Sequence, residues 1–451
     1  MNPVSEQQKL NLLNVGQKSV ELNFDGGQIS SDGGLLLLRE VENQVGIINA
    51  LAGRINDKRH PSYITHTVED MLMQRVSQIA AGYEDANDCD ELRNDPVLKV
   101  CADRLPETDD DLASQPTMSR FENSISRTQI YRIAKAFVDN FLASYEKPPQ
   151  ILVLDFDDTS DEVHGGQQLS VFNGYYSMKC FMPLHVYEGL SGKLITTILK
   201  SGKRADGKTI LAILKRLCSH IRSEFPNTTI VFRGDSHFAY PQTMEWIEQQ
   251  KNMFHVTGLT GNNVLRGNVE AHIERAKKIY ERKQDKVVLF HSFNYKAEKW
   301  NQFRRVVAKI EILADGKLNL RYIVTNMKEA KSSVLYKGIY CARGEAELYI
   351  KEHKLYLKSD RTSCHQFSAN QFRLFLHSAA YVLLHALKNN ILKNTQWANA
   401  TISTIRLKFL KIGARVRQLK TKIKVEFPTS FPYKKPLING FQILEILRQS
   451  P

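Results

Sequence analysis

Between residues 151 and 259 short apolar segments alternate with amphipathic ones, and this alternation restricts the fold more than any other feature. ILVLDFD is a nearly continuous apolar run that ends in acids, which is typical of a buried central strand. The segments that follow are CFMPLHVYEG and KLITTILK as strands, TILAILKRLCSHIRSEF as a helix, TTIVFRGD as a strand, YPQTMEWIEQQ as a helix and MFHVTGL as a strand. This order of three strands, a helix, a strand, a helix and a strand predicts an α/β core domain. Residues 149–261 form the first part of this core.

The segments on either side of this core have a different character. Residues 1–148, which end at the linker EKPPQ, carry helical patterns such as VEDMLMQRVSQIAA, and the stretch Ser119 to Tyr145 contains a second long helix. The short stretch SVELNFDGGQ is expected to form a hairpin arm. We therefore predict a helical N-terminal region.

A β-rich insertion is expected over residues 262–330. Here the helical pattern NVEAHIERAKKIYERK is followed by VVLFHSFNYKA, RRVVAKIEIL and LNLRYIVTN, which alternate as strands do. The core then resumes over residues 331–400 with the helix YCARGEAELYIKEHK and a buried helix. Residues 401–451 form a basic C-terminal region, because eight Lys and Arg residues lie between Thr401 and Lys424 without an acid.

The net charge points to a polyanionic partner. The chain has 451 residues, a formal charge of +14 and a pI near 9.3, and nucleic acid is the commonest reason for such an excess. The opening MNPVSEQQKLNLLNV does not resemble a signal peptide, and the longest apolar run, from Leu374 to Leu387, is too short to cross a bilayer. The six cysteines show neither zinc-ribbon spacing nor close pairs. We expect a cytoplasmic protein with no membrane partner.

Aspartates end two of the expected strands. Asp155 and Asp157 are two residues apart and point to the same side of a strand, whereas Asp158 points to the other side; Asp235 follows the last apolar residue of VFRGD. Carboxylates near a core edge need a cation, and hard oxygen ligands suit Mg²⁺ or Mn²⁺. The alternative for either motif alone is a turn-forming or helix-capping acid.

The spacing within YCARGEAELYIKEHK places four polar residues on one helix face. Tyr340, Arg343, Glu347 and Lys354 fall within an arc of roughly 60° on an α-helix. A surface helix with ion pairs could share this pattern. If the helix instead packs against the sheet edge, Asp157, Asp235 and Glu347 can surround a pair of divalent ions, as in-line phosphoryl transfer requires.

Together these motifs resemble the bacterial insertion-sequence transposases that have a DDE active site and the Y-R-E-K signature. The spacing from Tyr340 to Lys354 matches that signature without gaps, and the resemblance extends over nearly the whole chain through GYEDANDCDELRNDP, LASQPTMSRFEN, LDFDDTSDEVHGGQQ and FRGDSHF. The resemblance implies a ribonuclease-H-like catalytic domain with a β-rich insertion before the glutamate. It further implies cleavage at the element's ends and transfer of the 3′-hydroxyl into target DNA.

The resemblance also implies the roles of individual residues. The catalytic and metal-binding triad is expected to be Asp157, Asp235 and Glu347, with Asp155 as the alternative to Asp157 and two Mg²⁺ or Mn²⁺ ions. The expected DNA-binding residues are Tyr340, Arg343, Lys354, His237, Arg415, Arg417 and Lys420, and the candidates for reading the terminal inverted repeats are Arg120, Arg127 and Arg132. Since synapsis joins two ends, we expect a homodimer on DNA.

Two other functions fit parts of the sequence. VLDFDDT resembles the opening motif of haloacid-dehalogenase phosphohydrolases, in which Asp155 would be the nucleophile and Asp157 the general acid. That function leaves the helix from Tyr340 to Lys354 and the basic tail unexplained. A catalytically silent DNA-binding regulator fits the charge equally well, but it gains nothing from acids that face a phosphate backbone.

Overall fold

The computed structural model describes residues 10–449, and the chain forms two compact units. One unit contains the described residues up to Ala52 together with Asp57–Phe121 and the segment from Ala386 onward; the other contains Gly53–Asn56 and Glu122–His385. These units differ from the linear division expected from the sequence, because the N-terminal helices share a unit with the basic C-terminal region.

The first unit is helical with small β elements. Its helices are α1 (Leu35–Val45), α2 (Ile47–Ala52), α3 (Val68–Ala81), α4 (Asp88–Leu92), α5 (Pro96–Cys101), α14 (Ile402–Ile405), α15 (Lys434–Gln449) and the start of α6 (Gln115–Ser124). Its strands are β1 (Leu10–Val15), β2 (Lys18–Leu22), β3 (Ile29–Ser30), β15 (Ala414–Leu419) and β16 (Lys422–Glu426). Strand β15 pairs with both β16 and β3, which ties the two ends of the chain together.

Local sequence explains several of these elements. Thr67 and Asp70 form a capping box at the start of α3, and Gly82 ends that helix with a φ of 97°. The hairpin of β1 and β2 includes part of the expected arm, since β2 supplies its SVEL residues and β1 precedes it.

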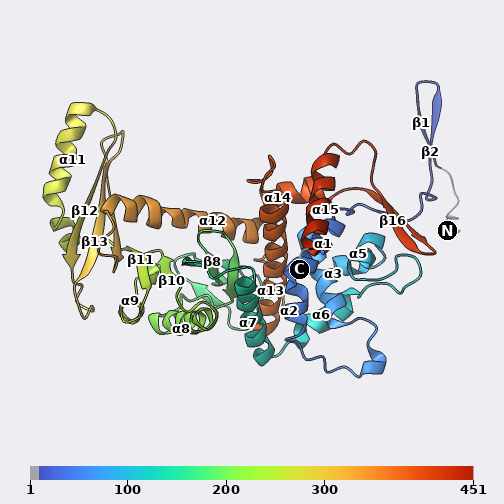
Figure 1. Ribbon diagram of the computed structural model, residues 1–451, viewed down its shortest axis with the longest axis horizontal. Coiled ribbons are helices and arrows are strands. Elements are labelled where there is room, and N and C mark those ends of the chain that lie inside the picture. Colours follow the sequence, from blue (N-terminus) through green and yellow to red (C-terminus); the bar gives the residue numbers. More distant parts are fainter. Residues whose placement is uncertain (1–9, 450–451) are drawn as a thin grey trace. The chain divides into compact units, whose positions relative to one another are not determined.

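The second unit is built on one large mixed sheet, so the chain is a mixed α/β protein (Figure 1). Five strands form its centre, namely β4 (Ile151–Asp158), β8 (Leu184–Glu188), β9 (Leu194–Ile198), β10 (Thr229–Gly234) and β11 (Met253–Leu259). They lie in the order β9-β8-β4-β10-β11, with β4, β10 and β11 parallel and β8 antiparallel to its two neighbours. Four of the five strands predicted over residues 151–259 are therefore confirmed. The fifth, CFMPLHVYEG, is wrong in its extent, because Cys180 and Phe181 belong to β7 (Met178–Phe181) of another sheet and β8 begins after Pro183.

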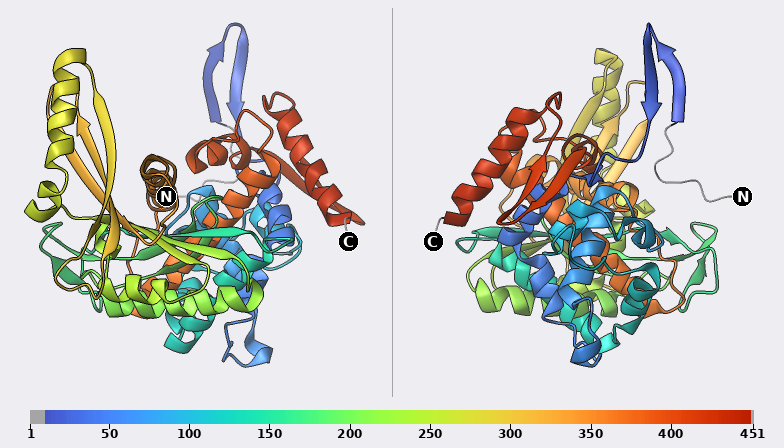
Figure 2. Two further views of the ribbon diagram at one scale, coloured as in Figure 1. Left: turned by 60° about the vertical axis from the view of Figure 1, so that its left-hand side comes forward. Right: turned by 90° about the vertical axis from the view of Figure 1, so that its right-hand side faces the viewer.

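The insertion extends this sheet instead of forming a separate one. Strands β12 (Val287–Tyr295), β13 (Arg304–Ile312) and β14 (Leu318–Thr325) form a meander, and β14 pairs antiparallel with β11. Helices α10 (Asn263–Gly267) and α11 (Glu270–Lys283) precede the meander, and α11 packs on it through Ile273 and Ala276. Figure 2 shows these long strands continuing from the central sheet with α11 against them.

Helices cover both faces of the central sheet. On one face, α7 (Arg127–Ala143), α8 (Gly207–Glu224) and α9 (Pro241–Glu248) pack on Leu152, Leu154 and Phe156 of β4. Because side chains alternate along a strand, Val153, Asp155 and Asp157 face the opposite side. There Val153 belongs to a core cluster that includes Leu335 and Tyr336.

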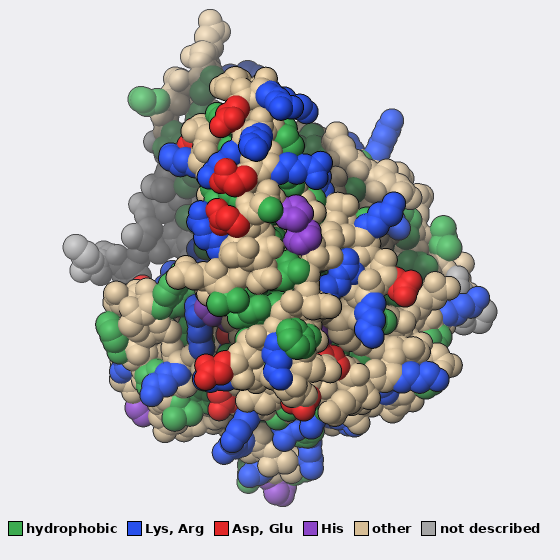
Figure 3. Space-filling model, turned by 90° about the vertical axis from the view of Figure 1, so that its left-hand side faces the viewer, with side chains coloured by type: hydrophobic (Ala, Val, Ile, Leu, Met, Phe, Trp, Pro, Cys, Tyr) green, Lys and Arg blue, Asp and Glu red, His purple; other side chains and the backbone are tan. Residues whose placement is uncertain are grey.

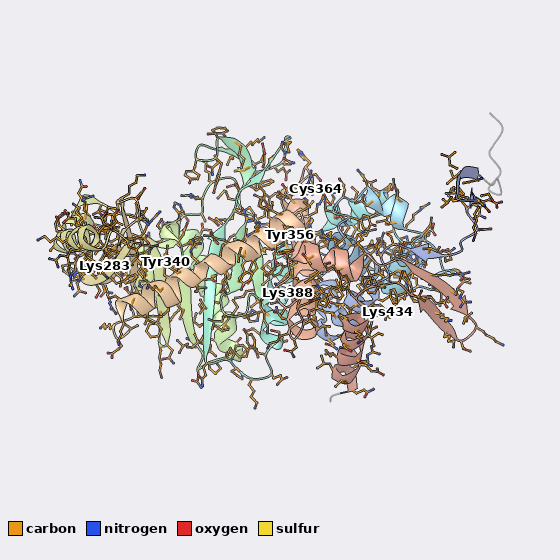
Figure 4. The ribbon with its side chains drawn as sticks, turned by 90° about the horizontal axis from the view of Figure 1, so that it is seen from above. Lys283, Tyr340, Tyr356, Cys364, Lys388 and Lys434 are labelled. Carbon is orange, nitrogen blue, oxygen red and sulfur yellow. The ribbon has the colours of Figure 1, made fainter. Side chains whose placement is uncertain are left out.

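Leu335 and Tyr336 belong to a long helical segment that we call the signature helix, residues 334–356. It consists of π-helical turns at Val334–Tyr340, a 3₁₀ turn at Cys341–Arg343, α12 (Gly344–Lys351) and further π-helical turns at Glu352–Tyr356. Figure 4 shows this helix crossing the strands between the labelled residues Tyr340 and Tyr356. The buried helix α13 (Phe367–Ala386) follows it, as predicted.

A small sheet branches from the core between β4 and β8. We call it the β-flap: β5 (Asp161–Glu162), β6 (Val171–Asn173) and β7 (Met178–Phe181), in the order β5-β7-β6. A bridge between Phe181 and Ser201 attaches it to the segment that follows β9.

One expected helix is wrong in its extent. The stretch Ser119 to Tyr145 contains two helices, α6 and α7, because Ser126 and Gln129 form a capping box that starts a new helix. Among residues 10–449, no helix is long and apolar enough to cross a bilayer.

Candidate active site at the ends of β4 and β10

Asp155 and Asp157 lie on the same side of β4 but have different partners. Asp155 is fully buried, and its carboxylate forms a two-pronged ion pair with Arg233 of β10, with Nε–Oδ1 and Nη2–Oδ2 distances of 2.5 and 2.6 Å. The two residues are directly opposite in the β4–β10 register. Arg233 Nη1 also donates to the carbonyl of Ile339, 2.6 Å away, and so ties the signature helix to the sheet.

The Asp155–Arg233 pair leaves no room for a side chain at position 189. A Cβ on Gly189 would lie 2.5 Å from both Asp155 Oδ2 and Arg233 Nη2. Burial raises the pKa of Asp155, while the hydrogen bond and charge of Arg233 lower it. Asp155 is therefore a structural anchor between the strands, because Arg233 engages both of its carboxylate oxygens.

Asp157 faces Arg343 of the signature helix. Arg343 Nη1 lies 2.8 Å from Asp157 Oδ2, and Arg343 Nη2 lies 2.9 Å from Glu347 Oε1. Arg343 and Asp157 are largely buried, whereas the Glu347 side chain is 63% exposed. One guanidinium thus joins two of the three predicted triad carboxylates, which lie 190 positions apart as their residue numbers show.

The pKa of Asp157 shows that the third predicted carboxylate, Asp235, influences it. Burial raises the pKa of Asp157 to about 7; Arg343 opposes this rise, and Asp235, Asp158 and Glu347 add to it. Both Asp235 and Glu347 therefore lie within electrostatic reach of Asp157. Carboxylates that raise one another's pKa in this way favour a neutralising cation.

Asp235 caps the short turn at the end of β10. Its Oδ1 accepts a hydrogen bond from the backbone N–H of His237, 2.8 Å away, and the ring Nε2 of His237 lies 3.9 Å from Oδ2. The other ring nitrogen, Nδ1, lies 2.6 Å from Nη1 of Arg204. This cap fixes the backbone around Asp235 and leaves its side chain partly exposed.

Tyr340 lies over β11 beside Asp235. A Cβ on Gly258 would come within 2.7 Å of the Tyr340 hydroxyl and 2.8 Å of the Ser236 backbone nitrogen. Only glycine at position 258 therefore allows the signature helix and the Asp235 turn to approach β11 so closely. Burial raises the pKa of Tyr340, and Arg343 opposes this rise.

Lys354 lies on the same helix but contacts the start of the β-flap. Its Nζ donates to the Ser160 carbonyl, lies 3.5 Å from Thr159 Oγ1 and is 3.6 Å from Asp161 Oδ1. Burial raises the pKa of Asp161 to about 7, and Lys354 opposes this rise. Lys354 thus holds the segment that directly follows Asp157 and Asp158.

Sequence reasoning missed several residues that shape the site. Lys200 lies 2.6 Å from Asp158 Oδ1 in a nearly buried ion pair. Gly258, Gly189, Arg233 and Arg204 were not singled out either. Only the glycines in short strands gave a signal, since such glycines often mark a close backbone approach.

The three predicted ligands are of a chemical type that binds divalent metal ions. Asp157, Asp235 and Glu347 offer the hard carboxylate oxygens that Mg²⁺ and Mn²⁺ prefer. Within residues 10–449, no three His, Cys, Asp or Glu side chains form a ready-made metal-binding group. Arg343 forms ion pairs with two of these acids, Asp157 and Glu347. A metal ion that binds the triad has to compete with this guanidinium.

The remaining predicted DNA-binding residues belong to other surfaces. Arg415, Arg417 and Lys420 lie in or beside β15 in the first unit, and Arg417 pairs with Glu426 at 3.0 Å. Several other cations of this basic stretch have partners: Arg406 donates to the Ala80 carbonyl, and Lys411 lies 2.8 Å from Asp32. Several cations of residues 401–424 are therefore already paired within the protein, which the sequence did not indicate.

The three N-terminal arginine candidates do not share one unit. Arg120 belongs to the first unit, whereas Arg127 and Arg132 are exposed on α7 of the second. The second unit also presents cations on α11, including Arg275, Lys278 and Arg282. Figure 3 shows more Lys and Arg than Asp and Glu on the face that presents α11.

Comparison with known proteins agrees with this arrangement at the level of the family. Residues 13–449 match the family model described as transposase DDE domain group 1. A solved structure of the piggyBac transposase synaptic complex with hairpin DNA is 10% identical, with a TM-score of 0.42 and coverage of 93% of this chain and 82% of that chain. No curated protein matches the chain. Because the family model covers almost all of its length, the chain belongs to the DDE-domain transposases of group 1.

Proposed function

We propose that the chain cleaves DNA at the ends of its own mobile element and joins the freed 3′-hydroxyl to target DNA. In the first step a water oxygen would bond to phosphorus, the bond from phosphorus to the 3′-oxygen would break, and that oxygen would take up a proton. In the second step the 3′-hydroxyl would attack a phosphodiester of the target, whose own 3′-oxygen would leave. One site would serve both steps.

The observation that carries this proposal is the joining of Asp157 and Glu347 by Arg343, with Asp235 within electrostatic reach. We assign Asp157, Asp235 and Glu347 as the metal-binding triad. Bound there, divalent ions would activate the attacking oxygen and stabilise the leaving one. Carboxylate ligands suit Mg²⁺ or Mn²⁺. Two ions would suit an in-line displacement, because one contacts the attacking oxygen and the other the leaving oxygen.

The protein's own residues have distinct tasks in this proposal. Arg343 shares its single positive charge between Asp157 and Glu347 and would turn to a phosphate oxygen where a metal ion binds these acids. Tyr340 and His237, which flank Asp235, would contact the backbone near the cleaved bond. Lys354 would hold the Thr159–Asp161 segment in place and would also attract a phosphate group of the DNA.

The topology supports a ribonuclease-H-like core. In the five central strands, β4 and β10 are adjacent and parallel, and a hairpin of β8 and β9 extends the sheet on the other side of β4. Asp157 lies at the end of β4, and Asp235 directly follows β10. Since the ends of adjacent parallel strands meet at one sheet edge, this topology explains why two acids distant in the sequence approach each other.

We further propose that the partners are the element's terminal inverted repeats and target DNA. Arg120, Arg127, Arg132, Arg415, Arg417 and Lys420 remain candidates for contacts with this DNA outside the active site. A homodimer would bring the two element ends together.

The phosphohydrolase alternative is disfavoured by the partner of Asp155. A nucleophilic carboxylate has to reach its substrate, but Asp155 is fully buried and both of its oxygens face Arg233. Asp157 is the more accessible of the two acids, since its side chain is 14% exposed and that of Asp155 is fully buried.

The proposed function is tested by nicking of a labelled duplex that carries an element end. With Mg²⁺ or Mn²⁺, the native chain is expected to cut it, and Glu347→Gln to lose at least about a hundredfold in rate, because a metal ligand is lost. The matched control is Glu345→Gln, two residues away on the same helix and exposed, which is expected to cut normally. Equal cutting by Glu347→Gln would refute the triad, and DNA binding without cutting by the native chain would favour the regulator.

A further inference from the structure

The tip of the β-flap exposes two aromatic side chains. Phe172 is 66% and Tyr175 78% exposed, and Leu169 beside them is also exposed. Exposed aromatic groups of this size that gather on one hairpin mark an interaction surface more often than isolated ones do. The flap directly follows the strand that bears Asp157, so this surface belongs to the same part of the second unit as the candidate active site.

The hairpin holds these aromatic groups in a fixed turn. Asn173 Oδ1 accepts hydrogen bonds from the backbone nitrogens of Tyr175 and Tyr176, at 3.0 and 3.3 Å. Asn173 Nδ2 donates to the carbonyl of Gly202, 2.8 Å away. At Gly202 a Cβ would lie 2.3 Å from the Cys180 carbonyl oxygen, so the hairpin lies tightly against the segment after β9. The aromatic rings are therefore presented by an ordered structure.

Cations surround the same tip. The guanidinium of Arg204 lies 5.2 Å from the centre of the Tyr175 ring, and Lys179 is opposite Phe172 in the strand register. Lys203 and Lys179 are exposed. Aromatic rings next to guanidinium and ammonium groups are suited to nucleic acid, since the rings stack on bases and the cations pair with phosphates.

A series of contacts connects this tip to the site. Arg204 contacts both Tyr175 and Nδ1 of His237, and the backbone of His237 is capped by Asp235. A strand of DNA whose phosphate lies at Asp235 would therefore pass Arg204 next and the aromatic tip after it.

We propose that Tyr175, with Arg204 beside its ring, forms a stacking platform for unpaired nucleobases next to the cleaved phosphate. The proposal rests on the proposed function for its location, because it takes the DNA to be cut at Asp157, Asp235 and Glu347. Bases within a duplex are already stacked on one another, so the platform selects bases that have left the helix. The ligand class is single-stranded or locally unpaired DNA.

The test compares two strands of equal length and phosphate number, oligothymidylate and a strand made only of abasic sites. Binding is measured by fluorescence anisotropy in EDTA, so that cleavage is not required. The native chain is expected to prefer oligothymidylate by about fivefold or more, which corresponds to one stacked base. Tyr175→Leu is expected to reduce or abolish this preference, and Tyr175→Phe to keep it, since phenylalanine retains a ring that stacks.

Phe303→Leu serves as the matched control, because Phe303 is 69% exposed at a turn far along the chain in the same unit. It is expected to bind both strands as the native chain does. Retention of the full base preference by Tyr175→Leu combined with Phe172→Leu would overturn the proposal. The proposal would also be overturned if this double variant kept the preference for oligothymidylate but had an altered sedimentation coefficient. That result would show that the tip contacts another protein chain.

Cleavage assays on the same variants separate this proposal from the proposed function. If the native chain prefers oligothymidylate but does not nick element ends, the platform stands and the assigned chemistry fails. If it nicks element ends but has no preference for base-bearing strands, the chemistry stands and the platform fails.

Discussion

Arg343 Nη1 lies 2.8 Å from Asp157 Oδ2, so a protein cation contacts the first carboxylate of the proposed triad. The same guanidinium reaches Glu347, which is on its own helix, and thereby links the sheet to the signature helix. The side chains of Arg343 and Asp157 are only 16% and 14% exposed, so little water screens the attraction between their charges. The arrangement predicts that metal ions and Arg343 compete for the same carboxylates.

Replacement of Arg343 is therefore expected to have opposite effects on metal binding and on catalysis. In Arg343→Gln the acids lose their internal counter-charge, so Mn²⁺ affinity without DNA should rise by about tenfold, or about 1.4 kcal/mol. Nicking of element ends should fall, because the phosphate loses a contact. Calorimetric titration with Mn²⁺ measures the first effect. An unchanged or weaker Mn²⁺ affinity would contradict the competition.

Substitutions of Asp155 and Asp157 are expected to affect different properties, stability for Asp155 and activity for Asp157. Asp155→Asn leaves Arg233 with an uncompensated charge and should lower the free energy of unfolding by about 3–5 kcal/mol. Asp157→Asn should cost little stability, since burial already raises the pKa of Asp157 to about 7, but it should abolish nicking. Urea unfolding and the nicking assay on both variants check this. A stable, inactive Asp155→Asn protein beside an active Asp157→Asn protein would reverse the assignment.

Gly258→Ala is expected to disturb the site without a change in charge. The added methyl group would lie 2.8 Å from the Ser236 nitrogen, so the Asp235 turn or the Tyr340 ring has to move. We expect a stability loss of about 1–3 kcal/mol and a nicking rate at least about tenfold lower. Gly267→Ala is the matched control, because nothing lies within 4 Å of a Cβ at Gly267. Native nicking by Gly258→Ala would show that this close approach is unimportant.

Glu248 is expected to make stability depend on pH in the acid range. Burial alone would raise its pKa, but hydrogen bonds from His255 and Arg304 lower it to about 2. A folded pKa below the unfolded one means that the stabilisation is complete above about pH 4.5 and is lost as the pH falls towards 2. The contribution at neutral pH is about 2–3 kcal/mol.

Glu248→Gln should therefore unfold at a lower urea concentration at pH 7, and its stability should fall less than that of the native chain between pH 4.5 and 2. Urea titrations of both proteins across this range measure the difference. Parallel pH profiles would show that the Arg304–Glu248 pair does not carry this linkage. Glu245→Gln, on the same helix α9, is the control.

The sequence was most informative where one local pattern determines the structure. Buried strands such as ILVLDFD and capped helices such as the one after Thr67 were predictable, because hydrophobic period and capping chemistry are local. The placement of acids at the ends of β4 and β10 followed from the same patterns. The break at Ser126 was also encoded locally, by the capping box with Gln129, but the longer helical period concealed it.

Long-range pairing was not predictable in this way. Nothing in the period of β14 indicates that it pairs with β11, so the insertion was expected to be a separate subdomain. The pairing of β15 with β3, which joins the chain ends in one unit, depends on residues almost 400 positions apart. The Asp155–Arg233 pair depends on the β4–β10 register, and the π-helical turns of the signature helix change the angular spacing that a regular α-helix would give.

The convergence of the three carboxylates on one metal-binding site is tested most directly by affinity cleavage of the protein itself. Fe²⁺ bound in place of Mg²⁺, with ascorbate and peroxide, cuts the backbone only near the ion, and mass spectrometry locates the cuts. The account predicts cuts near Asp157, Asp235 and Glu347 in the same preparation, all suppressed by excess Mg²⁺ and all lost in Asp157→Asn. Cuts confined to one of these segments, or unaffected by Asp157→Asn, would contradict it.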